Sequence, residues 1–248
     1  MKYFSRRKGQ SAVSAAAYRR GERLYDRYYG RTYDFTRKTG IVFKRVLLPS
    51  NAPDRFYDSE ILWNEVESSE KRHDSRLARE VEISLPRSLR FADQVRMVIR
   101  YVKRCYISRG MCADISIHDK GDRNPHAHIM LTTREMTENG FGKKNREWDK
   151  RNNVELWRKE WENEINHEFE RQGLTTRVNH LSYERQGIDR TPTKHLGAYV
   201  NKLKKRGIET NLSKENDYIY KENEKREQKK QLEHKRNREC SYDYELSF

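Results

Sequence analysis

Apolar and polar side chains alternate in two short runs near the middle of the chain, 111–118 and 126–132. Successive side chains of a strand point to opposite faces of a sheet, so this alternation predicts two strands. The residues between the runs include Gly, Asn, Asp and Pro, the types that close turns. We therefore expect an antiparallel hairpin that brings three histidines together: His118, His126 and His128.

Other apolar runs have either strand length or helical spacing. Strands are predicted at 1–4, 41–48 and 77–86, and helices at 10–20, 55–73, 91–108, 154–171 and 191–206. From residue 41 the order is strand, helix, strand, helix, strand, strand, which is typical of an α+β fold. We expect an open, mostly antiparallel central sheet with helices packed on one side of it.

Polar segments interrupt and follow these elements. Loops are expected at 138–151 and 180–190. Beyond residue 211 charged side chains predominate, which predicts a solvated helix or a disordered tail. The sequence therefore predicts one folded domain at 1–210 and a charged tail at 211–248.

The charge of the chain points to a polyanionic partner. It carries 53 Lys and Arg against 38 Asp and Glu, a formal net charge of +15, and residues 1–45 alone hold 13 basic and 3 acidic side chains. Such a bias favours nucleic acid, although a structural RNA-binding protein would share it with an enzyme. Our candidates for phosphate contacts are Arg6, Arg7, Lys8, Arg19, Arg20 and Arg27. The segment 25–33, rich in Tyr and Arg, could stack on bases or could be a packed or solvated loop.

Hydropathy and cysteine spacing indicate the cellular compartment of the protein. No apolar run approaches the length of a membrane span, and the first residues lack the apolar stretch of a signal peptide, so we expect a cytoplasmic protein without membrane insertion. The three cysteines have no paired spacing, which fits a reducing compartment. Cys105 and Cys112 are predicted to be small buried side chains, and Cys240 receives no role.

The histidine hairpin is a candidate metal site. A His-x-His pair on a strand can also be a polar, half-exposed face, but the third histidine favours metal. No cysteine lies near, which argues against a closed structural zinc site, and three imidazoles leave coordination positions open. On the strand at 77–86, Glu80, Glu82 and Ser84 share a face that either meets solvent or completes the histidine site.

A metal in a strongly basic protein indicates a phosphodiester substrate. The attacking group would be either water, which gives hydrolysis, or a side chain, which gives a covalent intermediate. Tyrosines are abundant near the N-terminus.

Short motifs occur along the chain in a specific order. They are Gly9-Gln10-Ser11-Ala12 with Tyr18, Ala78-Arg79-Glu80-Val81 before Leu85-Pro86, His118 with Asn124-Pro125-His126-Ala127-His128, and Ser182-Tyr183 through Gln186-Gly187-Ile188-Asp189-Arg190 to Pro192 and His195. Over roughly residues 9–207 the chain resembles the MobA/MobL relaxases, which are plasmid mobilisation nickases of the histidine-hydrophobe-histidine endonuclease group.

The resemblance implies a palm-like relaxase fold and a metal-dependent DNA endonuclease and transesterase. Tyr18 would attack the scissile phosphate of single-stranded DNA at a transfer origin and form a 5′-phosphotyrosyl link and a free 3′-hydroxyl. His118, His126 and His128 would hold Mg²⁺ or Mn²⁺, and Glu80 would support or orient that site. Accessory mobilisation and coupling proteins would be partners.

Alternatives remain at this point. Tyr25 lies seven residues after Tyr18, which is two helical turns, and is expected to share its face, which makes it the substitute nucleophile. A replication initiator or transposase of the same group would nick a different origin, and a catalytically inactive nucleic-acid-binding protein would bind without cleaving.

Overall fold

The computed structural model describes residues 1–245. For Ala198, His234 and 237–245 it describes the backbone alone. The chain forms two compact units, of which the first is Met1–Val178 and the second begins at Asn179. The predicted domain at 1–210 thus spans the whole first unit and the start of the second.

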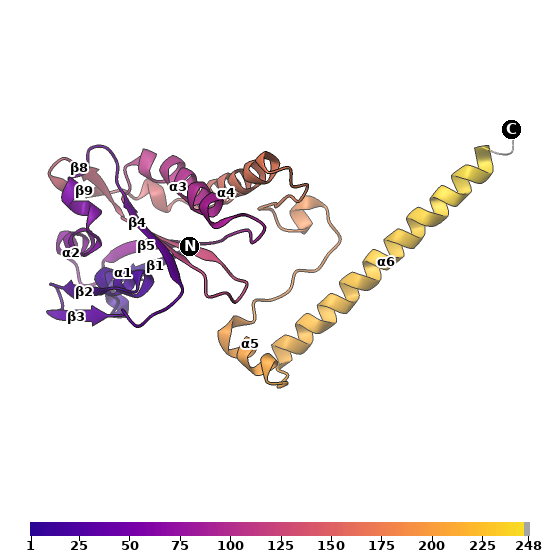
Figure 1. Cartoon of the computed structure of the whole chain (residues 1–248), viewed down its shortest axis with the longest axis horizontal. Helices are drawn as coiled ribbons and strands as arrows, with labels where there is room; N and C mark the ends of the chain where they lie inside the picture. Colours follow the sequence, from indigo (N-terminus) through magenta and orange to yellow (C-terminus); the bar gives the residue numbers. More distant parts are fainter. Residues whose placement is uncertain (246–248) are drawn as a thin grey trace. The chain divides into compact units, whose positions relative to one another are not determined.

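Five antiparallel strands form the sheet of the first unit, in the order β1-β5-β7-β6-β4 (Figure 1). Their bounds are Lys2–Ser5 for β1, Ile41–Leu47 for β4, Arg76–Ser84 for β5, Ala113–His118 for β6 and His126–Leu131 for β7. This arrangement confirms the predicted α+β fold with an open antiparallel sheet. The brief first strand is real and pairs with β5 at one edge.

The register of the central strands places the histidines. On β6 and β7, His118 lies opposite His126 and Ser116 lies opposite His128, as the hairpin prediction requires. The next strand, β5, places Glu82 opposite His128. Residues 119–125 connect β6 to β7 and contain no helix or strand.

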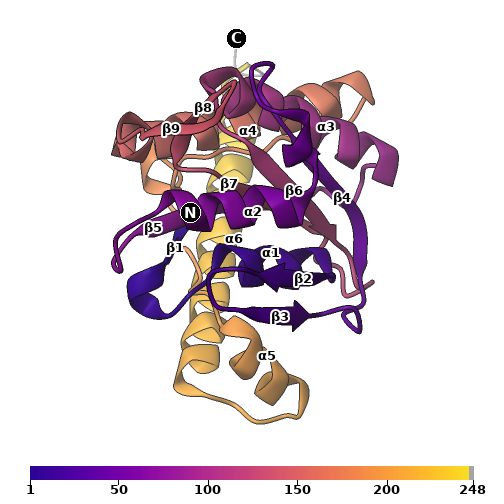
Figure 2. The ribbon, with the colours of Figure 1, turned by 90° about the vertical axis from the view of Figure 1, so that its left-hand side faces the viewer.

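Helices cover both faces of this sheet, so the prediction that they lie on one side is wrong (Figure 1, Figure 2). The first face packs against α1 (Ala12–Arg20) and α2 (Ser59–Ser69), and the second against α3 (Phe91–Cys105) and α4 (Arg151–Arg171). All six residues of β6 are buried. Its alternation of polar and apolar residues therefore separates two covered faces rather than a core face from solvent.

Helix α1 forms where its sequence predicts. Ser11 caps the first turn by accepting a hydrogen bond from the Ser14 backbone N–H at 3.0 Å. Gly21 ends the helix with a left-handed backbone at φ 60° and donates its N–H to the Ala17 carbonyl. A Cβ at Gly21 would lie 2.7 Å from Ile41 Cδ1, so the end of that flexible side chain would have to move. Small alanine side chains, fully buried at Ala16 and Ala17, let α1 lie close on the sheet.

Two further hairpins form where the sequence predicts no strands. The Tyr-rich and Arg-rich segment forms β2 (Arg23–Asp26) and β3 (Arg31–Asp34). The polar region at 138–151 is ordered in part as the hairpin of β8 (Arg134–Thr137) and β9 (Gly140–Lys144). Buried Met136 and the stacking of Phe141 on Phe56 anchor it, which a mostly polar composition hides. Short 3-10 helices lie at Arg6–Lys8, Asp54–Tyr57, Ile107–Arg109, Glu147–Asp149 and Glu184–Gln186.

The second unit contains α5 (Gly197–Lys205) and α6 (Asn211–Glu245). The helix predicted from 191 begins later, because Asn216 and Asn223 of α6 bind the backbone of the preceding segment. The amide of Asn223 pairs with Thr191 N and O at 2.9 and 2.8 Å, and that of Asn216 with Lys194 N and O at 2.8 and 2.7 Å. The described residues of the charged tail lie in α6.

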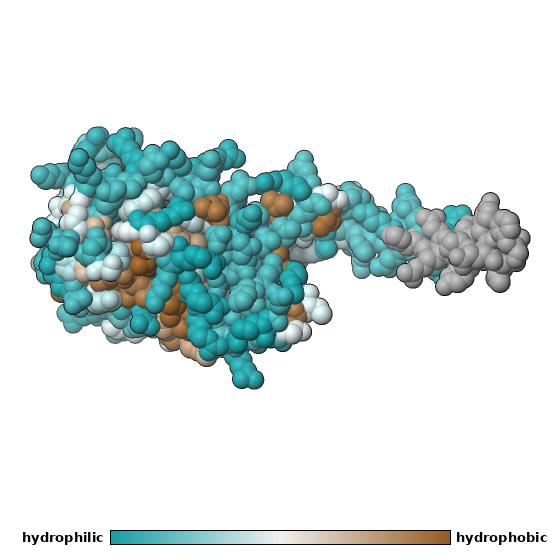
Figure 3. All heavy atoms as spheres, turned by 90° about the horizontal axis from the view of Figure 1, so that it is seen from above, coloured by the Kyte–Doolittle hydropathy of each residue, from teal (hydrophilic) through white to brown (hydrophobic). Residues whose placement is uncertain are grey.

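The surface of the protein reflects its hydrophilic composition. Hydrophilic side chains predominate on the face drawn in Figure 3, and apolar ones gather there in small patches. Cys105 and Cys112 are buried free thiols, as predicted, and the Cys240 side chain lies outside the described set. Within the part of the chain that the structure describes, no helix has both the length and the apolar character needed to cross a bilayer.

Candidate metal centre and active site

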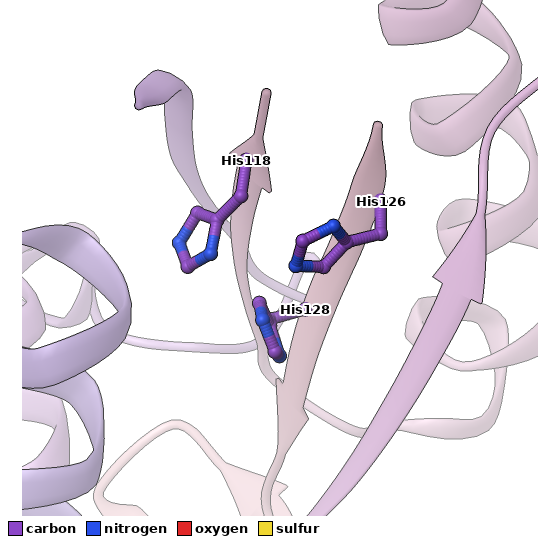
Figure 4. A group of neighbouring side chains, drawn as sticks. All are labelled: His118, His126 and His128. Carbon is purple, nitrogen blue, oxygen red and sulfur yellow. The ribbon is translucent and has the colours of Figure 1, made fainter. Parts of the chain in front are cut away.

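The structure brings the three predicted histidines together. Their rings point toward one another from β6 and β7, with centroids 4.6 to 5.3 Å apart (Figure 4). One nitrogen from each ring can be chosen so that all three lie within 4.8 Å of one another. Two nitrogens that bind one ion at about 2.1 Å lie at most about 4.2 Å apart, so small movements of these rings would let His118, His126 and His128 hold a metal ion together.

Each histidine has one ring nitrogen fixed by a hydrogen-bond acceptor. His118 Nε2 lies 2.6 Å from the Arg19 carbonyl oxygen, and His126 Nδ1 lies 2.7 Å from the Asn124 carbonyl oxygen. A carbonyl oxygen only accepts, so these nitrogens carry the protons and the opposite nitrogens keep their lone pairs. Metal-binding histidines have this arrangement in proteins, which shows that the donor set fits a divalent ion.

Burial keeps His118 neutral. Burial, the largest cause, together with the nearby positive charge of Lys38 lowers the pKa of His118 to about 4, although the hydrogen bond to Arg19 acts in the opposite direction. At neutral pH the imidazole is therefore in the form that coordinates metals.

The third histidine is held by Glu80. His128 Nδ1 donates to Glu80 Oε1 at 2.7 Å, and this buried carboxylate also accepts from Arg19 Nη2 at 2.8 Å and contacts Lys2 Nζ at 2.9 Å. Burial alone would raise the pKa of Glu80, but the hydrogen bonds from His128, Arg19 and Lys2 outweigh it and hold the pKa well below the usual carboxyl value. The sequence leaves two interpretations of this strand face: it meets solvent, or its carboxylates complete the histidine site. The contact of Glu80 with His128 fits the second interpretation.

Glu82 differs from its neighbour on the same face. Its side chain is 53% exposed, and its Oε2 lies 3.8 Å from His128 Nδ1, beyond hydrogen-bonding distance. Glu80, rather than Glu82, therefore sets the orientation of His128.

Tyr18 lies on α1, one residue before the carbonyl that fixes His118. Its side chain is 48% exposed and packs edge-on against Phe35, with ring centroids 5.2 Å apart. Tyr25 is not on the same helix face, because Gly21 ends α1 and Tyr25 lies on β2. The expectation that the two tyrosines share a face is thus wrong.

Lys38 is a neighbour of Tyr18 that the sequence does not reveal. Its Nζ lies 3.7 Å from the centroid of the Tyr18 ring and donates to the Tyr18 carbonyl oxygen at 2.7 Å. Burial, the largest cause, and the charges of Arg19 and Lys120 together lower the pKa of Lys38 to about 8. No motif contains Lys38, and only the three-dimensional contact identifies it.

The six candidate phosphate-binding residues fall into two groups. Arg7, Lys8 and Arg27 are exposed. Arg6 is buried, and its guanidinium binds Glu67 Oε2 at 2.7 Å and the Glu70 carbonyl at 2.5 Å. The side chain of Arg19 is 11% exposed and is bound to Glu80.

Arg20 binds a buried carboxylate of the same sheet face. It donates to Asp114 Oδ1 and to Glu22 Oε2, both at 2.7 Å. Asp114 on β6 also accepts from the Ser59 hydroxyl at 2.6 Å and from Trp63 Nε1 at 2.9 Å. The sequence contains one indication of this role for Asp114, its alternation with Ser116 and His118 along the strand. This alternation puts all three residues on the sheet face that packs against α1 and α2.

These features define a class: an α+β protein whose antiparallel sheet carries a three-histidine candidate metal centre beside a tyrosine-bearing helix. The chain belongs to the MobA/MobL family, whose model matches residues 10–206. This confirms the resemblance found in the sequence motifs.

Named relatives and a solved structure agree with the family. The chain is 34% identical to "Conjugal transfer protein TraA" of Agrobacterium fabrum over 85% of its own length and 22% of that protein. It is 30% identical to "Mobilization protein MobL" of Acidithiobacillus ferridurans over 83% of this chain and 62% of that protein. A chain in the structure titled "Molecular Basis of Vancomycin Resistance Transfer in Staphylococcus aureus" matches with a TM-score of 0.69 and 33% identity, covering 73% of this chain and 96% of that one. The chain thus spans about a fifth of the TraA relatives.

Proposed function

We propose that this chain is a relaxase of conjugative mobilisation, a site- and strand-specific nickase that acts on single-stranded DNA at a plasmid transfer origin. The observation that carries the proposal is the double attachment of α1 to the histidine site. The Arg19 carbonyl accepts from His118, and the Arg19 guanidinium binds Glu80, which in turn holds His128. This double attachment supports the choice of Tyr18 as nucleophile, because Tyr18 directly precedes Arg19 on α1.

In the proposed reaction the Tyr18 phenolic oxygen attacks the scissile phosphorus and loses its proton. The bond from phosphorus to the 3′-oxygen breaks, and that oxygen takes up a proton, which leaves a 5′-phosphotyrosyl link and a free 3′-hydroxyl. His118, His126 and His128 would hold Mg²⁺ or Mn²⁺, which when bound stabilises negative charge on the phosphate oxygens. The link conserves the phosphodiester energy, so reversal of the attack reseals the strand.

The basic N-terminal segment gives the substrate a path to the site. Exposed Arg7, Lys8 and Arg27 are the proposed phosphate contacts, whereas the bonds of Arg6, Arg19 and Arg20 to carboxylates assign those side chains to holding α1 in place. Partners that deliver the DNA, namely accessory mobilisation and coupling proteins, and action in the cytoplasm are proposed from the family.

The test uses a randomised pool of single-stranded oligonucleotides with Mn²⁺. Wild-type protein is expected to form a denaturant-stable adduct, and sequencing of the attached DNA identifies the origin. Tyr18→Phe is expected to abolish the adduct, whereas Tyr25→Phe, a matched change at an exposed tyrosine, retains it. An adduct with Tyr18→Phe would disprove the nucleophile, and binding without cleavage by the wild type would favour an inactive nucleic-acid-binding protein.

A further inference from the structure

A cavity of about 340 Å³ lies directly beside Tyr18. One wall is a face of α1 with Ser14, Ala15 and Tyr18, and the opposite wall is formed by Tyr33 and Phe35 at the end of the β2–β3 hairpin. This volume is at the lower end of the range for small-molecule sites, which is about 300–1,000 Å³. The metal centre does not use this cavity.

The hairpin has two different faces. Tyr33 lies opposite Leu24 and Arg31 lies opposite Asp26, and both partners are buried, so this face points to α1. Arg23 and Tyr25 alternate with these residues, lie on the other face and are exposed. The structure therefore separates the Tyr-rich and Arg-rich segment into a side that meets the cavity and a side that meets solvent.

The chemistry of the lining is that of a base-binding site. Tyr18, Tyr33 and Phe35 offer aromatic surfaces, and the Arg31 guanidinium carbon lies 4.5 Å from the centroid of the Tyr33 ring, with its Nε bound to the Tyr33 hydroxyl at 2.7 Å. Among the described residues that line the cavity, the charged ones are Arg31 and Arg19, of which Arg19 is paired with Glu80, and none is acidic. Aromatic rings and arginine planes stack on nucleobases, and positive charge attracts the adjoining phosphates.

We propose that this cavity binds the base of the nucleotide next to the scissile phosphate of single-stranded DNA. The position of that nucleotide rests on the proposed function, because Tyr18 is both the proposed nucleophile and part of the cavity wall. The base lies against Tyr33 and Phe35, and it contributes to the choice of the cleavage site. Tyr33 and Arg31 are thus residues that determine specificity.

Equilibrium binding tests the cavity without requiring cleavage. Short oligo(dT), oligo(dA) and oligo(dC) strands and an abasic strand of equal length are titrated in EDTA by fluorescence anisotropy. Tyr33→Ala is expected to weaken binding of at least one base-carrying strand about 10-fold, the size of one lost stacking contact, and to leave the abasic strand unaffected. Tyr25→Ala on the outer face of the hairpin is the matched control and is expected to change neither.

A second variant guards against a folding defect in Tyr33→Ala. Ser14→Leu fills the cavity from α1 with a good helix former while Tyr33 stays in place, and it is expected to reproduce the loss. Equal affinities of wild type and both variants for every base-carrying strand, or an equal loss on the abasic strand, would overturn the proposal.

Sequencing of adducts from the randomised pool separates this proposal from the proposed function. Tyr33→Ala is expected to reduce the sequence preference at one position beside the nick and to leave the other positions unchanged. An unchanged preference there would overturn the role of the cavity in specificity. If the wild type forms no adduct, the proposed function fails, whereas the binding measurements still decide whether the cavity holds a base.

Discussion

Glu80 Oε1 and His128 Nδ1 lie 2.7 Å apart, inside the first unit, with the carboxylate fully removed from solvent. This contact fixes the ring so that Nε2 is free for a metal ion. Glu80→Gln removes the negative charge and is expected to reduce Mn²⁺ affinity about 10- to 100-fold, as loss of such partners does in other metal sites. Isothermal titration calorimetry of the purified chain measures the change.

Glu82→Gln is the matched control for that experiment. Glu82 lies on the same strand face, but it is half exposed and does not reach His128 within hydrogen-bonding distance. We expect the Mn²⁺ affinity of the Glu82→Gln variant to stay within about 2-fold of wild type. If Glu82→Gln weakened binding as much as Glu80→Gln, overall negative charge rather than orientation of His128 would explain the result.

The donor set predicts an order of metal preference. Three imidazole nitrogens suit transition metals, whereas Mg²⁺ prefers oxygen ligands. Mn²⁺ is therefore expected to bind at least about 10-fold more tightly than Mg²⁺, as measured by electron paramagnetic resonance of Mn²⁺ with Mg²⁺ as competitor. The double change His126→Ala plus His128→Ala should abolish Mn²⁺ binding, while His73→Ala, at an exposed histidine, leaves it intact. Equal competition by Mg²⁺ would argue against three nitrogen ligands.

The sequence reveals the histidine hairpin because its evidence is local: strand alternation and turn residues together set the register of His118 against His126. It does not distinguish Glu80 from Glu82, since both share one face and only the packing of α1 over the sheet buries the first. The apolar alternation likewise cannot show that both sheet faces are covered. That depends on α3 and α4, which are distant in sequence from α1 and α2.

The contact of Lys38 with Tyr18 is another feature that the sequence alone does not predict. Its position over the Tyr18 ring depends on the path of the chain from β3 to β4, which no local pattern encodes. An ammonium group at this distance from an aromatic face contributes about 1–2 kcal/mol when partly desolvated. In the proposed attack the Tyr18 oxygen loses its proton, and the nearby ammonium group stabilises the negative charge that develops there. Lys38→Met is therefore expected to slow adduct formation about 10-fold, whereas oligonucleotide binding in EDTA stays within about 3-fold of wild type.

Lys38→Arg and Arg37→Met complete this test. Arginine keeps the positive charge and should restore much of the rate, and Arg37→Met, at the exposed neighbouring residue, should have little effect. The pKa of Lys38 is lowered to about 8, so its charge is present below about pH 8 and lost above it. The rate of wild type relative to Lys38→Arg should thus decline above about pH 8. A ratio that is independent of pH, together with a normal rate for Lys38→Met, would exclude a role for this charge.

Glu168 joins α4 to α3 and gives stability a defined pH dependence. Its buried carboxylate accepts from Arg171 Nη2 at 2.5 Å and from Arg100 Nη2 at 3.0 Å. The hydrogen bond from Arg171 is the main cause that lowers the pKa of Glu168 to about 2, from an ordinary value of 4.5. Because the folded-state pKa is lowered, the contribution to stability is complete above about pH 4.5 and is lost as the pH falls toward 2.

Glu168→Gln keeps the shape of the side chain and removes its charge. At neutral pH it is expected to lower the free energy of unfolding by roughly 2 kcal/mol, because two arginines lose their charged partner. Below about pH 4.5 the difference from wild type should shrink, because the unfolded wild-type chain takes up a proton at this carboxyl group while the folded carboxylate, with a pKa of about 2, stays ionised. Urea unfolding at about pH 7 and about pH 3.5 measures both values, with Glu170→Gln on the exposed side of α4 as the control. A difference that stays constant between the two pH values would mean that packing, rather than the charge of Glu168, connects the helices.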